Sequence, residues 1–276
     1  MLQKDSFDAN KVYNAYEEQE NPAPQTTWQD KIFSLSGFCN ICFIIMVCIL
    51  GYSFLGDLNF KLKHAFPQMT EATYKKINTE EEPVQTMLQN DGLKLERGEN
   101  DYTEYAYDKI AEYSLSGMIV AINTDFWLRG LMRNDFDNVS LMDIGIVWGK
   151  IADKDYVKKY LKFKSEKTST ARWLRYRYEC RGNDCLGFDY IKSHVAHTHL
   201  VPANDNIMSA LLTLKKYDKV KLDGYLVDLY FSKGGKAITS ISRTDNNAGS
   251  RGRNNGGGAC EIMLVKQVQI EERIYR

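Results

Sequence analysis

The longest hydrophobic pattern in the chain is an uncharged stretch from Ile32 to Gly56, closed by Lys31 on one side and Asp57 on the other. A helix needs about 20 mostly apolar residues to cross the hydrocarbon core of a membrane. The stretch is long enough, and no basic segment of the kind that begins a cleavable signal peptide abuts it. The pattern therefore predicts an uncleaved transmembrane helix over residues 31–57.

Polar sequence flanks this predicted helix on both sides. Residues 1–30 show no sustained apolar period, which predicts a mostly disordered tail. Residues 58–104 are also polar and contain the acidic run Glu80–Glu82. We therefore expect a tether between the helix and a folded domain.

From Tyr105 onward, apolar and polar residues alternate in short runs that are typical of β-strands. Such runs cover residues 113–122, 140–149, 171–180, 219–231, 236–243 and 260–270. Two helices are predicted between them, one over Ala152–Phe163 and one that ends at Tyr217 and has Asn204 or Asp205 as N-cap. The predicted fold class is α+β, with one transmembrane helix and a β-rich domain over residues 105–276. The domain is expected to contain a strongly curved sheet or small barrel with one or two packed helices, and Gly224 predicts a bend or bulge in it.

The charge balance narrows the classes of function. Lys plus Arg and Asp plus Glu number 36 each, which gives no electrostatic reason to expect a nucleic-acid partner. Positive residues favour the cytoplasmic side of a membrane. Because Lys61, Lys63, Lys75 and Lys76 follow the apolar stretch and only Lys31 lies close before it, the lysines alone place the C-terminal domain in the cytoplasm.

Several short motifs follow one another along the predicted domain. They are DIGIVWGKIAD (143–153), RWLRYRY (172–178), HVAHTHLVPAND (194–205), KVKLDGYLV (219–227), TSISR (239–243) and GACE (258–261). In this order the chain resembles a family of small, uncharacterised bacterial proteins with one N-terminal membrane anchor and one periplasmic domain. The resemblance implies a single-pass inner-membrane protein with a cytoplasmic N-terminus and a periplasmic C-terminal domain, against the lysine count. It implies no reaction, substrate or ligand.

Three of the four histidines lie within six positions, at His194, His197 and His199. On a strand His197 and His199 share a face and His194 points away, whereas on a helix only His194 and His197 share a face. The family motif has Asn at the position of His197. We therefore predict separate structural roles, with His199 hydrogen-bonded in the core and the other two more exposed. A metal site of all three histidines is the alternative.

The cysteines outside the apolar stretch suggest two kinds of chemistry. Cys260, with His199 or His194 as base, is a candidate nucleophile. Because it opens a strand and is not followed by a helix, we prefer the interpretation of a buried packing cysteine. Cys180 and Cys185 flank a turn that either closes a disulfide, as in an oxidising compartment, or leaves two thiols.

Two charged features are the remaining candidates for a functional site. The glycine-rich loop over residues 244–258 is a candidate binding site for an anionic ligand or a partner through Arg251 and Arg253, with a mobile hairpin loop as the alternative. Asp143 and Arg243 are each either a charged residue at a sheet edge or half of a buried ion pair.

These patterns together predict a non-enzymatic, membrane-anchored protein without a cofactor. Its periplasmic domain is expected to make protein contacts, within an envelope complex or as a homo-oligomer. The alternative is an envelope hydrolase or metal-dependent enzyme that uses His194, His197 and His199, with Cys260 as a further candidate.

Overall fold

The computed structural model describes residues 28–73, 75–89, 95–99, 104–123, 135–140, 142–168, 171–182, 184–241 and 260–276. By its internal contacts the chain divides into two units, Met1–Tyr52 and Ser53–Arg276. The predictions for residues 1–27 and for the loop with Arg251 and Arg253 lie outside the described residues.

The first long element is the helix α2, Trp28–Lys63. It is longer than the predicted helix at both ends. Within it, Ile41–Lys63 is long and apolar enough to cross a membrane, with a mean hydropathy of 2.2 over its most apolar window. Among the described residues, one helix thus meets the length and composition of a membrane span.

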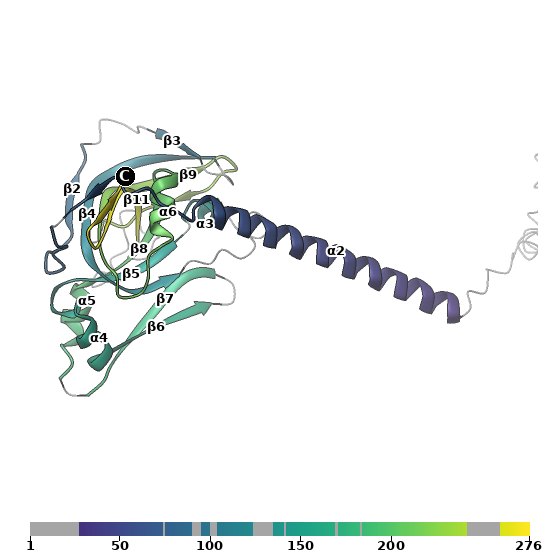
Figure 1. Ribbon diagram of the computed structural model, residues 1–276, viewed down its shortest axis with the longest axis horizontal. Helices are drawn as coiled ribbons and strands as arrows, with labels where there is room; N and C mark the ends of the chain where they lie inside the picture. The colour runs from purple at the N-terminus through teal and green to yellow at the C-terminus, as the bar shows by residue number, and fades with distance from the viewer. Residues whose placement is uncertain are drawn as a thin grey trace, which may run out of the picture. The chain divides into compact units, whose positions relative to one another are not determined.

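The second unit is rich in strands and contains a large curved sheet (Figure 1). Five strands supply most of it: β4 (Glu104–Asn123), β5 (Met142–Val147), β8 (Val195–Pro202), β9 (Lys219–Phe231) and β11 (Glu261–Ile270). They pair in the order β11–β8–β5–β4–β9, and β9 pairs in turn with β11, so the pairings form a closed cycle. Only the β8–β11 pair is parallel.

Five short strands extend this sheet: β1 (Glu71–Ala72), β2 (Val84–Met87), β3 (Leu95–Glu99), β10 (Lys236–Ala237) and β12 (Arg273–Tyr275). The first of them pairs with β12, while β2 and β3 pair with β4. The structure therefore differs from the expectation of a tether over residues 58–104, because this segment adds three strands to the sheet.

The helices of the second unit are short. They are α3 (Asp135–Val139), the 3-10 helix η1 (Gly149–Ile151), α4 (Lys154–Tyr160), α5 (Phe188–Ser193) and α6 (Asp205–Leu211). Side chains of α4 and α5 pack in one buried cluster with the start of β6 (Leu161–Thr168). Strand β6 pairs with β7 (Ala171–Cys180) in a hairpin, which Figure 1 shows beside the two helices. The predicted α+β class is confirmed, with many strands and few helices.

The largest buried cluster lies where the five paired strands and α6 face one another. All five strands and α6 contribute, for example through Leu115, Ile144, Leu200, Leu222 and Met263. In a strand, alternate residues face the same side. This cluster therefore takes one face of β8, through Ala196 and Leu200, and leaves the other face for His197, His199 and Val201.

Gly224 of β9 lies between two paired strands. It pairs with Tyr113 of β4 on one side and with Val265 of β11 on the other. A Cβ atom on Gly224 would lie 2.0 Å from the backbone oxygen of Leu264, and the register of β11 shifts between Val265 and Gln267. The predicted bulge is confirmed, with the extra residue on the partner strand of Gly224.

Helix α6 begins as the sequence predicts. The Asn204 side chain accepts a hydrogen bond of 2.9 Å from the backbone N–H of Ile207, which caps the helix. The helix ends at Leu211, earlier than predicted, because Thr213 and Leu214 close turns onto the carbonyls of Ala210 and Leu211.

The end of α2 packs on this small helix. Phe60 and Met208 form a buried pair, and Nδ1 of His64 lies 3.1 Å from Oγ of Ser209. On the surface, Nζ of Lys63 lies 3.3 Å from the carboxylate of Asp205. Within the second unit, the last turns of α2 are therefore part of the folded domain.

Candidate functional site

The face of β8 that is turned away from the largest buried cluster carries two histidines side by side. His197 and His199 are two residues apart on this strand, so both side chains lie on the same face. Their ring centroids are 5.0 Å apart, and their exposed fractions are 8% and 6%. The shared face agrees with the prediction, but the expectation that His197 is more exposed is wrong, because the neighbouring segments bury both rings.

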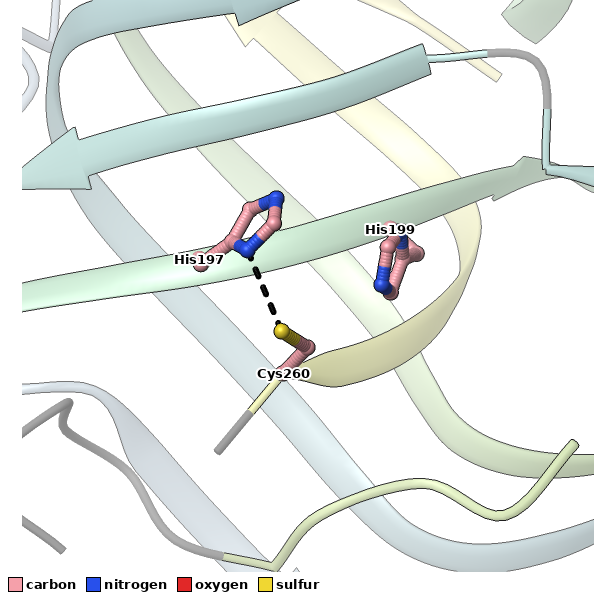
Figure 2. Close-up of side chains that lie close together, drawn as sticks. All are labelled: His197, His199 and Cys260. Carbon is pink, nitrogen blue, oxygen red and sulfur yellow. Dashed lines mark hydrogen bonds between the residues drawn. The ribbon is translucent and has the colours of Figure 1, made fainter. Parts of the chain in front are cut away.

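The parallel strand β11 brings a thiol to the same place. Glu261 pairs with Thr198 and Ile262 with His199, which sets Cys260 level with His197. Sγ of Cys260 lies 3.1 Å from Nδ1 of His197 (Figure 2). The sequence named His199 or His194 as the partner of Cys260, and the structure places His197 there.

The potential ligand atoms of His197, His199 and Cys260 all lie within 4.8 Å of one another. Figure 2 shows the three side chains grouped between β8 and the start of β11. Imidazole nitrogen and thiolate sulfur are the ligand types that zinc and related transition metals prefer. We call these three residues the His–His–Cys cluster.

A carboxylate orients one of the two rings. Asp143 of β5 pairs with His199 across the sheet, and its Oδ1 lies 2.6 Å from Nδ1 of His199. The carboxylate is only 1% exposed. Because a carboxylate accepts, Nδ1 of His199 donates this hydrogen bond, and Nε2 is the ring nitrogen that the contact does not use. Of the two readings for Asp143, the buried pair is the one observed, with His199 as partner, whereas Arg243 lies outside the described residues.

The surroundings hold the two rings in place. The Phe136 ring of α3 lies edge-on to His199, with centroids 5.1 Å apart. Gly145 is the residue of β5 opposite His197, so β5 itself places no side chain directly beside that ring. Val201 and Ile262 belong to an apolar cluster that continues along the same strands.

Burial also changes the proton affinity of His197. Loss of water around the ring lowers the pKa of His197 to about 4, and nearby His199 lowers it further while Asp143 opposes the shift. The ring is therefore neutral at physiological pH. A neutral ring does not form the imidazolium–thiolate pair that activates a nucleophilic cysteine.

His194 lies apart from the cluster. It follows α5, and its ring stacks on Tyr190 with centroids 3.9 Å apart. Its Nδ1 is 2.8 Å from the backbone oxygen of Tyr190, and Gly149, at a φ of 67°, approaches the ring closely. This agrees with the prediction that the three histidines do not converge.

Cys180 and Cys185 form a covalent link. Cys180 at the end of β7 and Cys185 are joined by a disulfide, with Cα atoms 5.7 Å apart. The bond closes the turn that the sequence suggested and ties β7 to the segment that leads into α5.

The sequence did not identify Asp143 as the partner of His199 or His197 as the partner of Cys260. Alternation along β8 is the signal that placed the histidines on one face. Asp143 is 56 positions from His199, and Cys260 is 63 positions from His197. Only the pairing of the strands in the fold brings these residues together.

Comparison with known proteins adds nothing to this description. No protein-family model matches the chain, and no curated protein or solved structure matches it. The function is therefore argued from the site alone.

Proposed function

We propose that this chain is a single-pass membrane protein whose folded domain binds a transition-metal ion at the His–His–Cys cluster. The observation that carries the proposal is the convergence of the three ligand atoms within 4.8 Å, two on one strand and one on its parallel neighbour. The proposed role is binding, and it requires no reaction at the site.

The contact between Asp143 and His199 supports this role. Histidines that bind metals usually donate their second ring N–H to a carboxylate or carbonyl, which fixes the ring and strengthens the ligand nitrogen. The bond of 2.6 Å from Nδ1 of His199 to Asp143 has this form.

A nucleophilic cysteine is less well supported. The thiol of Cys260 contacts the imidazole of His197, whose lowered pKa keeps it neutral, and it precedes a strand and not a helix. Metal binding requires neutral histidines and a thiolate that the ion itself creates. The surroundings of the cluster therefore favour a ligand role for the thiol.

The place of the cluster on the sheet gives further support by analogy. The closed cycle of pairings is that of a small barrel. In chain order its five strands are β4, β5, β8, β9 and β11, and α6 lies between the third and the fourth. A five-stranded barrel of this kind is found in the OB fold, which binds its ligands on the face of its second and third strands. Here these strands are β5 and β8. The analogy concerns the location of a ligand and not its identity.

Helix α2 supports the membrane part of the proposal, since Ile41–Lys63 is long and apolar enough to span a bilayer. The disulfide between Cys180 and Cys185 favours a domain outside the cytoplasm, because such bonds persist in oxidising compartments. We therefore propose a periplasmic domain, as the family resemblance implies. Contact with a protein partner stays a prediction from the sequence.

Elemental analysis of the full chain, purified in detergent, tests the metal site. We expect about one transition-metal ion per chain, and loss of that ion in His197→Ala, His199→Ala and Cys260→Ser. Two control variants replace a histidine and a cysteine that lie outside the cluster: His194→Ala and Cys42→Ser should retain the ion. Protein without metal, or equal metal in all five variants, contradicts the proposal.

A further inference from the structure

We infer that a cavity on the curved sheet binds a small zwitterion, an α-amino acid with an apolar side chain. The cavity lies over β2, β4, β9 and β11 and has a volume of about 590 Å³. Sites for small ligands typically have about 300–1,000 Å³. No residue of the His–His–Cys cluster lines this cavity, so the inference does not depend on the proposed metal site. We call it the sheet cavity.

The strand pairings arrange side chains of the sheet cavity in two neighbouring rows. In one row Ser114 pairs with Asp223, which pairs in turn with Gln267. In the other row Glu112 pairs with Tyr225. Residues two positions apart on a strand point to the same face. Both rows therefore line the cavity from one face of the sheet, the face turned away from the largest buried cluster.

The charges of the first row are engaged by the fold. The Ser114 hydroxyl donates to Oδ1 of Asp223 at 2.6 Å, and the Gln267 side-chain amide donates to Oδ2 at 3.1 Å. Arg276, which also lines the cavity, donates to the Gln267 side-chain oxygen at 2.7 Å and to the carboxylate of Glu71 at 3.1 Å. This row therefore forms a hydrogen-bonded floor.

Lys266 supplies a positive charge beside this floor. It is the extra residue of the bulge in β11, where the pairing with β9 shifts. A bulge re-aims a side chain, and Nζ of Lys266 lies 5.6 Å from the centroid of the Tyr225 ring. The second lysine over this ring, Lys109, is paired with Glu96, on which Lys266 acts only at longer range. Among the described residues, Lys266 has no ion pair of its own.

Glu112 supplies a negative charge on the other side of Tyr225. Its side chain is exposed and lines the cavity, and within the described part of the chain its carboxylate forms no ion pair. Neighbouring strands lie about 4.8 Å apart, so two such steps, about 10 Å, separate the backbones of Glu112 and Lys266. Because these two side chains do not meet in an ion pair, a small charged group has room between them.

An α-amino acid matches this pair of charges, because it carries an ammonium and a carboxylate on one carbon atom. Its ammonium can donate to Glu112 while its carboxylate accepts from Lys266, and hydrogen bonds between charged groups are the strong ones. A longer peptide carries these two charges at opposite ends. The Tyr225 ring and the Val84 side chain, which is 61% exposed, give the cavity an apolar surface. An apolar side chain of the ligand covers that surface.

Saturation-transfer NMR, which detects weak ligands, tests the inference with L-phenylalanine as the probe. The full chain is used in detergent, and a sample of detergent alone corrects for uptake of the probe by micelles. Two analogues each lack one charge: N-acetyl-L-phenylalanine has no ammonium, and L-phenylalaninamide has no carboxylate. We expect saturable binding of phenylalanine and binding of each analogue that is weaker by about fivefold or more.

Four variants connect each charge of the probe with its residue. Glu112→Gln should bind phenylalanine more weakly and no longer distinguish it from the N-acetyl analogue. Lys266→Met should likewise lose the distinction between phenylalanine and the amide. Glu272→Gln and Lys236→Met remove exposed charges outside the sheet cavity and should bind all three probes as the wild type does.

Three results would overturn the inference. The first is a wild-type chain that shows no saturable binding of phenylalanine. The second is equal binding of all three probes to the wild type, since an apolar contact alone then holds them. The third is wild-type discrimination in both Glu112→Gln and Lys266→Met, because the probe then binds elsewhere on the chain.

Discussion

Two buried histidines of this protein each make a polar contact of the same length in different surroundings. At the end of α2, Nδ1 of His64 lies 3.1 Å from the hydroxyl of Ser209, and on β8, Nδ1 of His197 lies 3.1 Å from the thiol of Cys260. Each contact joins segments far apart in the sequence, by 145 and 63 positions.

What differs is the second layer of contacts. Around His64 stand the rings and methyl groups of Phe60 and Met208, which fasten a helix to the domain. Around His197 stand a second histidine and, through it, a carboxylate. A buried histidine among ring and methyl groups indicates packing, whereas convergent ligand atoms with an orienting carboxylate indicate chemistry.

The frame that supports both regions should fail when Gly224 is substituted. A Cβ atom there would lie 2.0 Å from the backbone oxygen of Leu264, which cannot move without disturbing the β9–β11 pairing. We expect Gly224→Ala to lower the free energy of unfolding by about 3 kcal/mol, measured by urea denaturation of the full chain in detergent. Gly187→Ala is the matched control, because nothing lies within 4 Å of its added Cβ. Equal stability of the two variants would refute the close approach.

Removal of the Phe60 ring should break the packing region and spare the chemical one. Phe60 is 4% exposed against Met208 and Leu212. We expect Phe60→Ala to cost about 2 kcal/mol, below the range for a central core ring because the cluster is small. Thermal unfolding measures the loss, and metal content should not change. Phe66→Ala controls for loss of an aromatic ring, since Phe66 is 88% exposed. If both variants melt alike, the contact of α2 with α6 is not part of the fold.

Asp143→Asn should do the reverse and affect the His–His–Cys cluster more than the fold. Asparagine keeps the size of the side chain but loses the charge that orients His199 and balances the ion. Loss of such a partner typically weakens metal binding by about 10- to 100-fold. Competition with a chromophoric chelator measures the affinity. Asp155→Asn, on the exposed side of α4, is the control. An unchanged affinity would mean that Asp143 serves the fold alone.

The same comparison explains how much the sequence could predict. Local patterns were enough for α2, for the cap at Asn204 and for the shared face of His197 and His199, because each depends on residues a few positions apart. The pairing of β8 with β11 was not predictable, since nothing local places Cys260 beside His197. The strands β2 and β3 were also missed, because they are short and exposed, as a linker would be, and only the pairing with β4 makes them strands.

The smallest expected effect is electrostatic and lies on strand β3, far from both regions in the sequence. Glu96 accepts a hydrogen bond of 2.8 Å from the Tyr107 hydroxyl and forms an ion pair with Lys109, both on β4. Hydrogen bonding to Lys109 and then to Tyr107 lowers the pKa of Glu96 below its usual value of 4.5, although burial opposes the shift. A carboxylate with a lowered pKa in the folded state adds stability above its unfolded pKa, and that stability is lost as the pH falls through the folded pKa.

Wild type should therefore be slightly more stable than Glu96→Gln at pH 7, and the curves of unfolding free energy against pH for the two proteins should meet at acidic pH. Because Glu96 is largely exposed, the difference should be a few tenths of a kcal/mol at most and shrink in high salt. Paired urea titrations across pH measure it, and a gap that persists in acid would assign the effect to the shape of the side chain and not to its charge.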